Sequence, residues 1–134
     1  MPVTIQWDNP EQTILRYNFE SPWTFSELDN ARRIGYEMVD KVPHQGLVGV
    51  LLVLPKQGVM PSNAVTNALG QMRVRHKRTI VMTVVSDNPF VKVLYNTLTA
   101  VNTAAKLTFM HADDLDTARA MVVARLETSR TPKD

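Results

Sequence analysis

The strongest constraint on the fold is Leu47–Leu54, a continuous stretch without a polar side chain. It is far shorter than the roughly 20 apolar residues of a membrane span. A strand that faces water on one side alternates polar and apolar residues, whereas a strand that is apolar on both faces is typical of a parallel sheet covered by helices. Thr79–Val85 is a second stretch of this kind. The two segments therefore predict neighbouring parallel strands at the centre of an α/β fold.

The remaining segments alternate between strand and helix patterns. Residues 3–7 and 14–20 alternate polar and apolar side chains and are joined by a short turn, which predicts an antiparallel hairpin. Helical spacing predicts helices near residues 24–42, 62–76, 89–105 and 113–126, and Leu107–Met110 is a last short strand. The order ββαβαβαβα predicts a mostly parallel five-stranded sheet with an antiparallel first edge strand and helices on both faces. We expect one domain over residues 1–127 and a polar tail over 128–134.

The clearest local signal is the start of the first helix. Thr24 and Glu27 have the spacing of a capping box, in which each side chain bonds the backbone N–H of the other. Gly35 in the middle of the helix costs about 1 kcal/mol relative to alanine, so a close packing contact would explain it. The apolar residues at helical spacing predict a buried stripe, formed by Leu28, Ala31, Ile34, Met38 and Val42.

Two later helices also have recognisable starts. Asn88 followed by Pro89 is a cap residue with proline at the first helical position. Asp113 opens the last helix. The acidic residues at its start are explained better by their attraction to the helix dipole than by metal binding. The inner face of that helix is predicted to consist of Leu115, Ala118, Met121 or Val122, and Leu126.

Composition excludes several classes of function. The 134 residues include no cysteine, which removes disulfides, thiol catalysis, zinc fingers and iron–sulfur clusters and favours a cytoplasmic location. The first residues lack the features of a signal peptide, and no apolar run is long enough to span a membrane. Three dispersed histidines offer no metal-ligand spacing, and no catalytic motif is present, so we expect no cofactor, no metal and no enzymatic activity.

The net charge of +2 is mild for a protein that binds nucleic acid. The densest basic run lies near the end of the second predicted helix and comprises Arg73, Arg75, His76, Lys77 and Arg78. No aromatic residue interleaves it to stack on bases. We interpret the run as cations at a helix C-terminus and do not expect nucleic acid as a partner.

The element order, the Trp23-Thr24 start of the first helix, the Leu47–Leu54 strand and the Asn88-Pro89-Phe90 segment together resemble the anti-sigma-factor-antagonist superfamily. This is the STAS or SpoIIAA-like fold, and the likeness is greatest to its small stand-alone bacterial members. The resemblance covers Val3 to Leu126 and implies a non-enzymatic regulatory or protein-interaction domain with a protein partner.

Regulatory members of that superfamily carry a phosphorylated serine or threonine at the start of the second helix. Ser62 is the residue that matches this position here. The acid that precedes it and the glycine that follows it in the family motif are absent from Met60-Pro61-Ser62-Asn63, which argues against switching by a kinase. A plain helix cap is the simpler interpretation of Ser62.

Ligands of parallel sheets bind beyond the carboxyl ends of the strands. The loops expected there supply a candidate phospho-acceptor or anion site made of Ser62, Asn63 and Lys56. They also supply a candidate rim for a partner or ligand, made of Trp23, Thr24, Val59, Met60, Ser86, Asn88 and His111. Lys56 and His111 could equally be ordinary solvated side chains, and the apolar loop residues could fold back into the core.

Three alternatives follow from the same residues. Related lipid-carrying folds share this architecture, and the small apolar residues Ala100, Val101, Ala104 and Ala105 also favour a carrier of a small apolar ligand. An enzyme with an unfamiliar site at the same rim is a second alternative. The open edge of the first strand would permit a homodimer.

Overall fold

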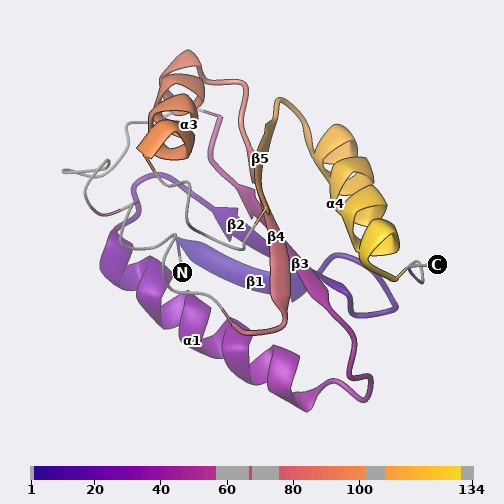
Figure 1. Ribbon diagram of the computed structural model, residues 1–134. Coiled ribbons are helices and arrows are strands. Elements are labelled where there is room, and N and C mark those ends of the chain that lie inside the picture. The colour runs from indigo at the N-terminus through magenta and orange to yellow at the C-terminus, as the bar shows by residue number, and fades with distance from the viewer. Residues whose placement is uncertain (1, 57–66, 68–75, 102–107, 131–134) are drawn as a thin grey trace.

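The computed structural model describes residues 2–56, 67, 76–101 and 108–130 (Figure 1). Its five strands form one sheet in the order β1-β2-β3-β4-β5. The first strand runs antiparallel to the second, and every other neighbouring pair is parallel. This confirms the predicted mixed sheet with an antiparallel edge strand. The strands are β1 (Val3–Trp7), β2 (Ile14–Phe19), β3 (Val48–Val53), β4 (Thr79–Val85) and β5 (Thr108–Ala112).

The centre of the sheet is the parallel pair β3 and β4, as the two apolar stretches predict. Val50 lies opposite Met82 and Leu52 lies opposite Val84. Leu51 and Val81 have no exposed surface and face one side of the sheet, whereas Val50 is 5% exposed and faces the other. The hydrophobic stretches are therefore explained by burial on two faces.

The helices divide between the two faces of the sheet (Figure 1). The helices α1 (Phe25–Lys41) and α3 (Pro89–Val101) cover one face, and α4 (Leu115–Arg130) covers the other. Right-handed crossovers between strands added in one direction place successive helices on the same face, which accounts for α1 and α3. The predicted helix over residues 62–76 lies outside the described residues, apart from the helical Asn67 and the non-helical His76. The last helix continues past residue 127 to Arg130.

The buried stripe of α1 differs from the prediction. The helix buries Leu28, Ala31, Gly35 and Val39, whereas Ile34 is 45% exposed. Gly35 faces the sheet, and a Cβ atom there would collide with the hydroxyl of Tyr17 on β2. This is the close contact that the mid-helix glycine required, and it turns the neighbouring Ile34 toward solvent.

The helix starts are fixed by side-chain caps. The backbone N–H of Glu27 donates to Thr24 Oγ1 over 3.1 Å, and the N–H of Thr24 donates to Glu27 Oε1 over 2.9 Å, which confirms the capping box. Asn88 Oδ1 accepts from the N–H of Phe90 at 2.9 Å. The cap of α4 is Asp114, not Asp113, because Asp114 Oδ1 accepts from the N–H of Thr117 at 2.7 Å. The predicted inner face of α4 is confirmed by the burial of Ala118, Val122 and Leu126.

The basic run near residue 76 has a structural role in its described part. Arg78 donates to the backbone oxygens of Val39, His44 and Gly46 over 2.9 to 3.0 Å. The last carbonyl oxygens of a helix lack hydrogen-bond donors within the helix, and a nearby cation can supply them. Arg78 therefore fixes the C-terminal end of α1. His76 is 8% exposed and belongs to the protein interior. Arg78 therefore lies at a helix C-terminus, as predicted for the run, but at that of α1; the helix predicted directly before the run lies outside the described residues.

A buried carboxylate ties the hairpin to α4. The side chain of Asp8, which follows β1, has no exposed surface and binds two arginines. It accepts from Arg16 Nη1 at 2.8 Å, from Arg119 Nε at 2.6 Å and from Arg119 Nη2 at 3.0 Å. The hydrogen bonds and charge of Arg119, with help from Arg16, lower the pKa of Asp8 although burial opposes the change.

Candidate functional site

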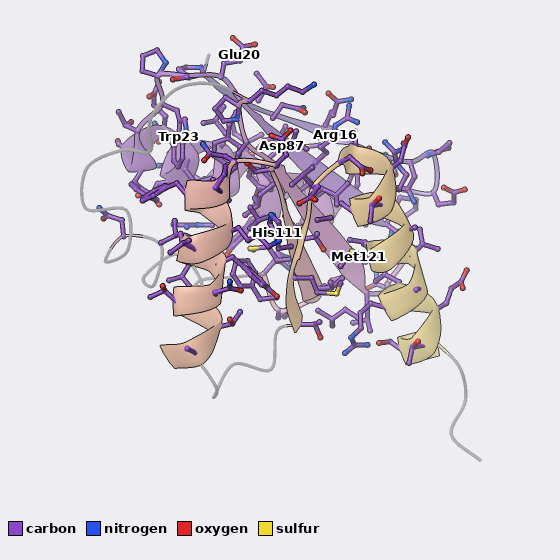
Figure 2. The ribbon with its side chains drawn as sticks, turned by 90° about the horizontal axis from the view of Figure 1, so that it is seen from above. Arg16, Glu20, Trp23, Asp87, His111 and Met121 are labelled. Carbon is purple, nitrogen blue, oxygen red and sulfur yellow. The ribbon has the colours of Figure 1, made fainter. Side chains whose placement is uncertain are left out.

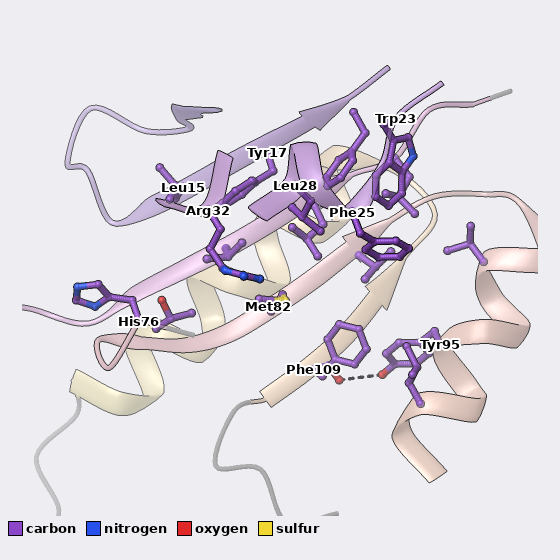
Figure 3. Close-up of a pocket in the computed structure, with 18 of the residues that line it drawn as sticks. Leu15, Tyr17, Trp23, Phe25, Leu28, Arg32, His76, Met82, Tyr95 and Phe109 are labelled. Atoms are coloured by element: carbon purple, nitrogen blue, oxygen red, sulfur yellow. Dashed lines mark hydrogen bonds between the residues drawn. The ribbon is translucent and has the colours of Figure 1, made fainter. Parts of the chain in front are cut away.

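A cavity of about 120 Å³ lies between α1 and α3, over one face of the sheet (Figure 3). Both helices and strands β2 to β5 contribute side chains to its walls. Nearly all of these side chains are aliphatic or aromatic. Representative described residues of the wall are Leu15, Tyr17, Trp23, Phe25, Leu28, Arg32, Leu52, His76, Met82, Val84, Leu94, Tyr95, Leu98 and Phe109.

Aromatic rings build two parts of the wall. The rings of Trp23 and Phe25 meet edge to face with their centroids 5.1 Å apart. Across the cavity, the rings of Tyr95 and Phe109 lie 5.2 Å apart, and Tyr95 Oη donates to the backbone oxygen of Phe109 over 2.9 Å (Figure 3). This bond joins α3 to the edge strand β5 and fixes the position of the Tyr95 ring.

Two basic side chains of the described residues, Arg32 and His76, enter the same wall (Figure 3). Arg32 Nη2 donates to Asp29 Oδ1 over 2.6 Å along α1. His76 Nε2 lies 2.7 Å from Asp40 Oδ1, and its Nδ1 accepts from the N–H of Arg78 at 3.1 Å. An acceptor role at Nδ1 leaves Nε2 as the donor, so contacts within the protein engage both nitrogens of this ring.

The hydroxyls of Tyr17 and Tyr95 in the wall stay neutral at physiological pH. Burial raises the pKa of Tyr17, and Tyr36 raises it further, whereas the positive charge of Arg32 acts in the opposite direction. Burial also raises the pKa of Tyr95. None of the described wall residues is acidic. Among the described wall residues, Arg32 is therefore the one with a permanent charge.

The predicted rim is formed in part by residues that hold loops together. Figure 2 shows where two of its residues, Trp23 and His111, lie. Trp23 is 5% exposed and belongs to the cavity wall, and Thr24 serves in the capping box. Ser86, Asn88 and His111 do come together, because His111 Nε2 lies 2.8 Å from the backbone oxygen of Ser86 and Ser86 Oγ accepts from the N–H of Asn88 at 3.1 Å. The imidazole binds the carbonyl and not the hydroxyl, so this arrangement is not a nucleophile with its base.

The predicted anion site is described only in part. Lys56 is exposed in the segment that follows β3. Ser62, Asn63, Val59 and Met60 lie outside the described residues. The assignment of Ser62 as a phospho-acceptor thus stays a prediction.

Sequence reasoning missed the cavity and most of its wall. One signal was available, since Arg32 shares the helical face of Leu28 and Val39 and so lies beside the buried stripe. An arginine at that position must either extend to solvent or meet a partner inside. No comparable signal in the sequence indicates that Met82 and Phe109 line the cavity, because both have the pattern of ordinary strand residues.

Comparisons of the chain with models of protein families, with curated proteins and with solved structures found no match. Within the described part of the chain, no group of three or more histidine or acidic side chains is placed to hold a metal ion. The helices described there lack the combination of length and hydropathy that crossing a membrane requires. The fold and the site define an α/β domain with a mixed sheet and an apolar cavity on one face.

Proposed function

We propose that the protein is a non-enzymatic binding domain that holds a small apolar molecule in the cavity between α1 and α3. The cavity carries this proposal, since close-packed interiors contain few voids larger than a water molecule. The cavity is partly open, so water can enter it. A molecule that covered its apolar walls would gain the free energy of removing apolar surface from water.

The dimensions and walls of the cavity indicate the kind of ligand. An apolar cavity of about 150 Å³ is known to stay dry and to bind benzene. The present cavity is slightly smaller, and edges and faces of aromatic rings surround it. We therefore expect a ligand whose apolar body is about the size of one aromatic ring.

A titration with a neutral apolar probe tests the proposal. Toluene added to the purified protein should change the fluorescence of the buried Trp23 in a saturable manner and should raise the melting temperature. Leu52→Phe adds volume to the cavity wall and should abolish both effects. Val123→Phe, on the exposed side of α4, is the matched control and should leave them intact.

The opposite results would contradict this function. Saturable binding of toluene that survives Leu52→Phe would mean that toluene binds elsewhere on the protein. An absence of saturable binding would rule out the proposed function. Native mass spectrometry of the protein from its own source gives an independent check. We expect an added mass that disappears on denaturation, and a clean mass of the bare chain would count against a resident ligand.

A regulatory protein-interaction role, as the resemblance to anti-sigma-factor antagonists implies, is the second candidate. Phe90 and Val93 on α3 are 52% and 62% exposed. Residues three apart share a helix face, and adjacent exposed apolar side chains often mark contact surfaces. Val93→Asp should weaken co-purification of a protein partner, whereas Val123→Asp on α4 should not. A partner that is retained equally by both variants would argue against this role.

A further inference from the structure

The strand β1 lies at the edge of the sheet, where one side of its backbone has no neighbouring strand. Within the described part of the chain, β2 is the strand that pairs with it. The N–H of Asp8, which directly follows β1, donates to the backbone oxygen of Ile14 over 2.7 Å. Bonded and non-bonded positions alternate along an antiparallel pair, so the even-numbered residues of β1 bond β2. Val3, Ile5 and Trp7 therefore direct their N–H and C=O groups away from the sheet.

The sequence of β1 does not protect this edge. Proteins usually guard an exposed edge strand with charged side chains, a proline or a bulge. The five residues of β1 include no charge and no proline, and their register with β2 is regular. The opposite edge strand, β5, differs, because the hydroxyl of Tyr95 on α3 donates to the backbone oxygen of Phe109. The edge of β1 is thus the better candidate for pairing with another strand.

An apolar strip continues from this edge onto α1, which packs on β1 (Figure 1). Arg32 and Tyr36 mark the side of α1 that lines the cavity, and that side faces α3 and β5. At about 100° per residue, Ile34 and Met38 lie on the other side of the helix, which is nearer the β1 edge. Ile34 is 45% exposed, and Met38 and Ile5 are partly exposed. Exposed apolar side chains that gather in one place are typical of a contact surface.

We propose that a second copy of the chain is the partner of this surface. Its β1 pairs antiparallel with the first β1 about a twofold axis that passes through the sheet at Ile5. Val3 of one copy then lies opposite Trp7 of the other, and the odd-numbered positions form about six backbone hydrogen bonds. The two sheets become one continuous sheet, so that β1 is no longer an edge in either copy.

The spacing of strands and helices allows this pairing. A twofold axis perpendicular to the sheet keeps both copies of α1 on the same face. Each α1 lies over β1 and β2, since it packs on β1 and its Gly35 meets Tyr17. Paired strands lie about 4.8 Å apart, so the axes of the two α1 helices are separated by roughly 10 Å, twice the strand spacing. Helices pack at about 8–10 Å, and the two copies of α1 therefore pack together over the joined strands.

The twofold symmetry also matches the residues along α1. Tyr17, which is paired with Ile5, contacts the helix next to Ile34, so Ile34 lies near the axis and meets its own copy. Glu27 and Lys41 lie about two turns before and after Ile34 on the same side of the helix. Because the two copies of α1 run in opposite directions, Glu27 of one copy approaches Lys41 of the other. The surface is thus apolar at its centre and complementary in charge at both ends.

Analytical ultracentrifugation of the full chain over a range of concentrations tests the proposal. The contact surface is small, so we expect a dimer with a dissociation constant in the micromolar range. Ile34→Glu brings two carboxylates together at the axis and should raise that constant by about a hundredfold. Lys41→Glu should raise it severalfold, because it places two acids at each end. Val123→Glu is the matched control, since Val123 is exposed on α4, and it should leave the dimer intact.

Hydrogen exchange of the unaltered protein gives a second test, which does not depend on the folding of any variant. The backbone N–H groups of Val3, Ile5 and Trp7 should be protected in concentrated solution and should exchange rapidly after dilution below the dissociation constant. Those of Thr4 and Gln6 bond β2 and should be protected under both conditions.

Three results would overturn the proposal. The first is a protein that stays monomeric at millimolar concentration, and the second is a dimer that survives Ile34→Glu. The third is a dimer in which the odd-numbered N–H groups of β1 stay unprotected, since the contact would then lie on another surface. The proposed function stands or falls separately, because the binding of toluene tests the cavity between α1 and α3 and not the edge of the sheet.

Discussion

The two faces of the sheet are packed in different ways. On the α4 face, the side chains that meet at the centre expose 1% of their surface or less, and they include Ile14, Leu51, Val81, Ala118 and Val122. On the α1 and α3 face, the corresponding side chains surround a cavity of about 120 Å³. Both faces hold a buried hydrophobic core, but the α1 and α3 face also leaves a space, which the proposed ligand would occupy.

Residue size explains the difference. Gly49 on β3 lets α4 approach so closely that a Cβ atom there would collide with Val122. The opposite face instead carries the rigid rings of Trp23, Phe25 and Tyr95. Flexible side chains such as methionine fill irregular gaps, whereas rigid rings cannot adapt to them. The rings therefore leave a space that the aliphatic side chains of the same wall and Met82 do not fill.

The largest effect is expected from Asp8, which anchors the α4 face. Asp8→Asn removes the carboxylate that binds Arg16 and Arg119 and should lower the free energy of unfolding by about 3 kcal/mol, the lower end for a broken buried pair. Arg119 is 36% exposed and can regain water, which limits the loss. Urea unfolding at pH 7 measures it. Asp116→Asn is the control, since Asp116 binds the same arginine but is 95% exposed and should matter little.

The same carboxylate gives the protein a defined pH dependence. The pKa of Asp8 is lowered from 3.8 by the hydrogen bonds and charge of Arg119. A carboxyl whose pKa is lower in the folded state stabilises the fold above its unfolded pKa, and that stability is lost as the pH falls through the folded value. Unfolding should thus become easier below about pH 4. If Asp8→Asn shows the same acid dependence as the unaltered protein, this assignment of the effect is wrong.

The next effect concerns the close approach of α4 to the sheet. Gly49→Ala places a methyl group against Val122 and Val81 and should destabilise the protein by about 2 kcal/mol, as overpacking of a rigid core does. Val122→Ala in the same chain removes the principal obstacle. Thermal unfolding of the double variant should therefore show a smaller loss than the two single losses added together. Additive losses would contradict the proposed contact.

A parallel substitution on the cavity face should cost less. Gly35→Ala meets the hydroxyl of Tyr17, but alanine also improves the helix by about 1 kcal/mol, so we expect a net loss of about 1 kcal/mol. In a Tyr17→Phe background the obstructing oxygen is gone, and Gly35→Ala should then become neutral or stabilising. Urea unfolding of the unaltered protein, the two single variants and the double variant measures the coupling free energy between the two sites. Without such coupling, the contact with Tyr17 would not be the reason for a glycine at position 35.

Part of this architecture could be predicted because it depends on local signals. The apolar stretches around Leu51 and Val81 require burial on two faces whatever surrounds them, and the structure pairs them in parallel. The caps at Thr24 and Asn88 are formed within a few residues of chain. Such features follow from backbone hydrogen bonding and from the spacing of apolar residues along the chain.

The rest depends on contacts between distant segments, which the sequence pattern does not contain. Ile34 fits a buried stripe as well as Gly35 does, and the hydroxyl of Tyr17 decides between them. The sequence around Arg78 is typical of a surface cation, and only the folded structure shows that it binds the end of α1. The cavity itself arises where α1, α3 and the sheet meet imperfectly, so no single segment predicts it.

The smallest effect should come from the cap of α3 and would sharpen the contrast between the helices. Asn88→Ala removes the acceptor for the N–H of Phe90 and should cost about 1 kcal/mol or less. The bond from Tyr95 to Phe109 still holds α3 to β5, so we expect local opening of α3 with little change elsewhere. Hydrogen exchange should show faster exchange in the first turn of α3 and unchanged protection in α4. Equal acceleration in both helices would mean that the two faces open as one unit, and the contrast between the two helices would then be wrong.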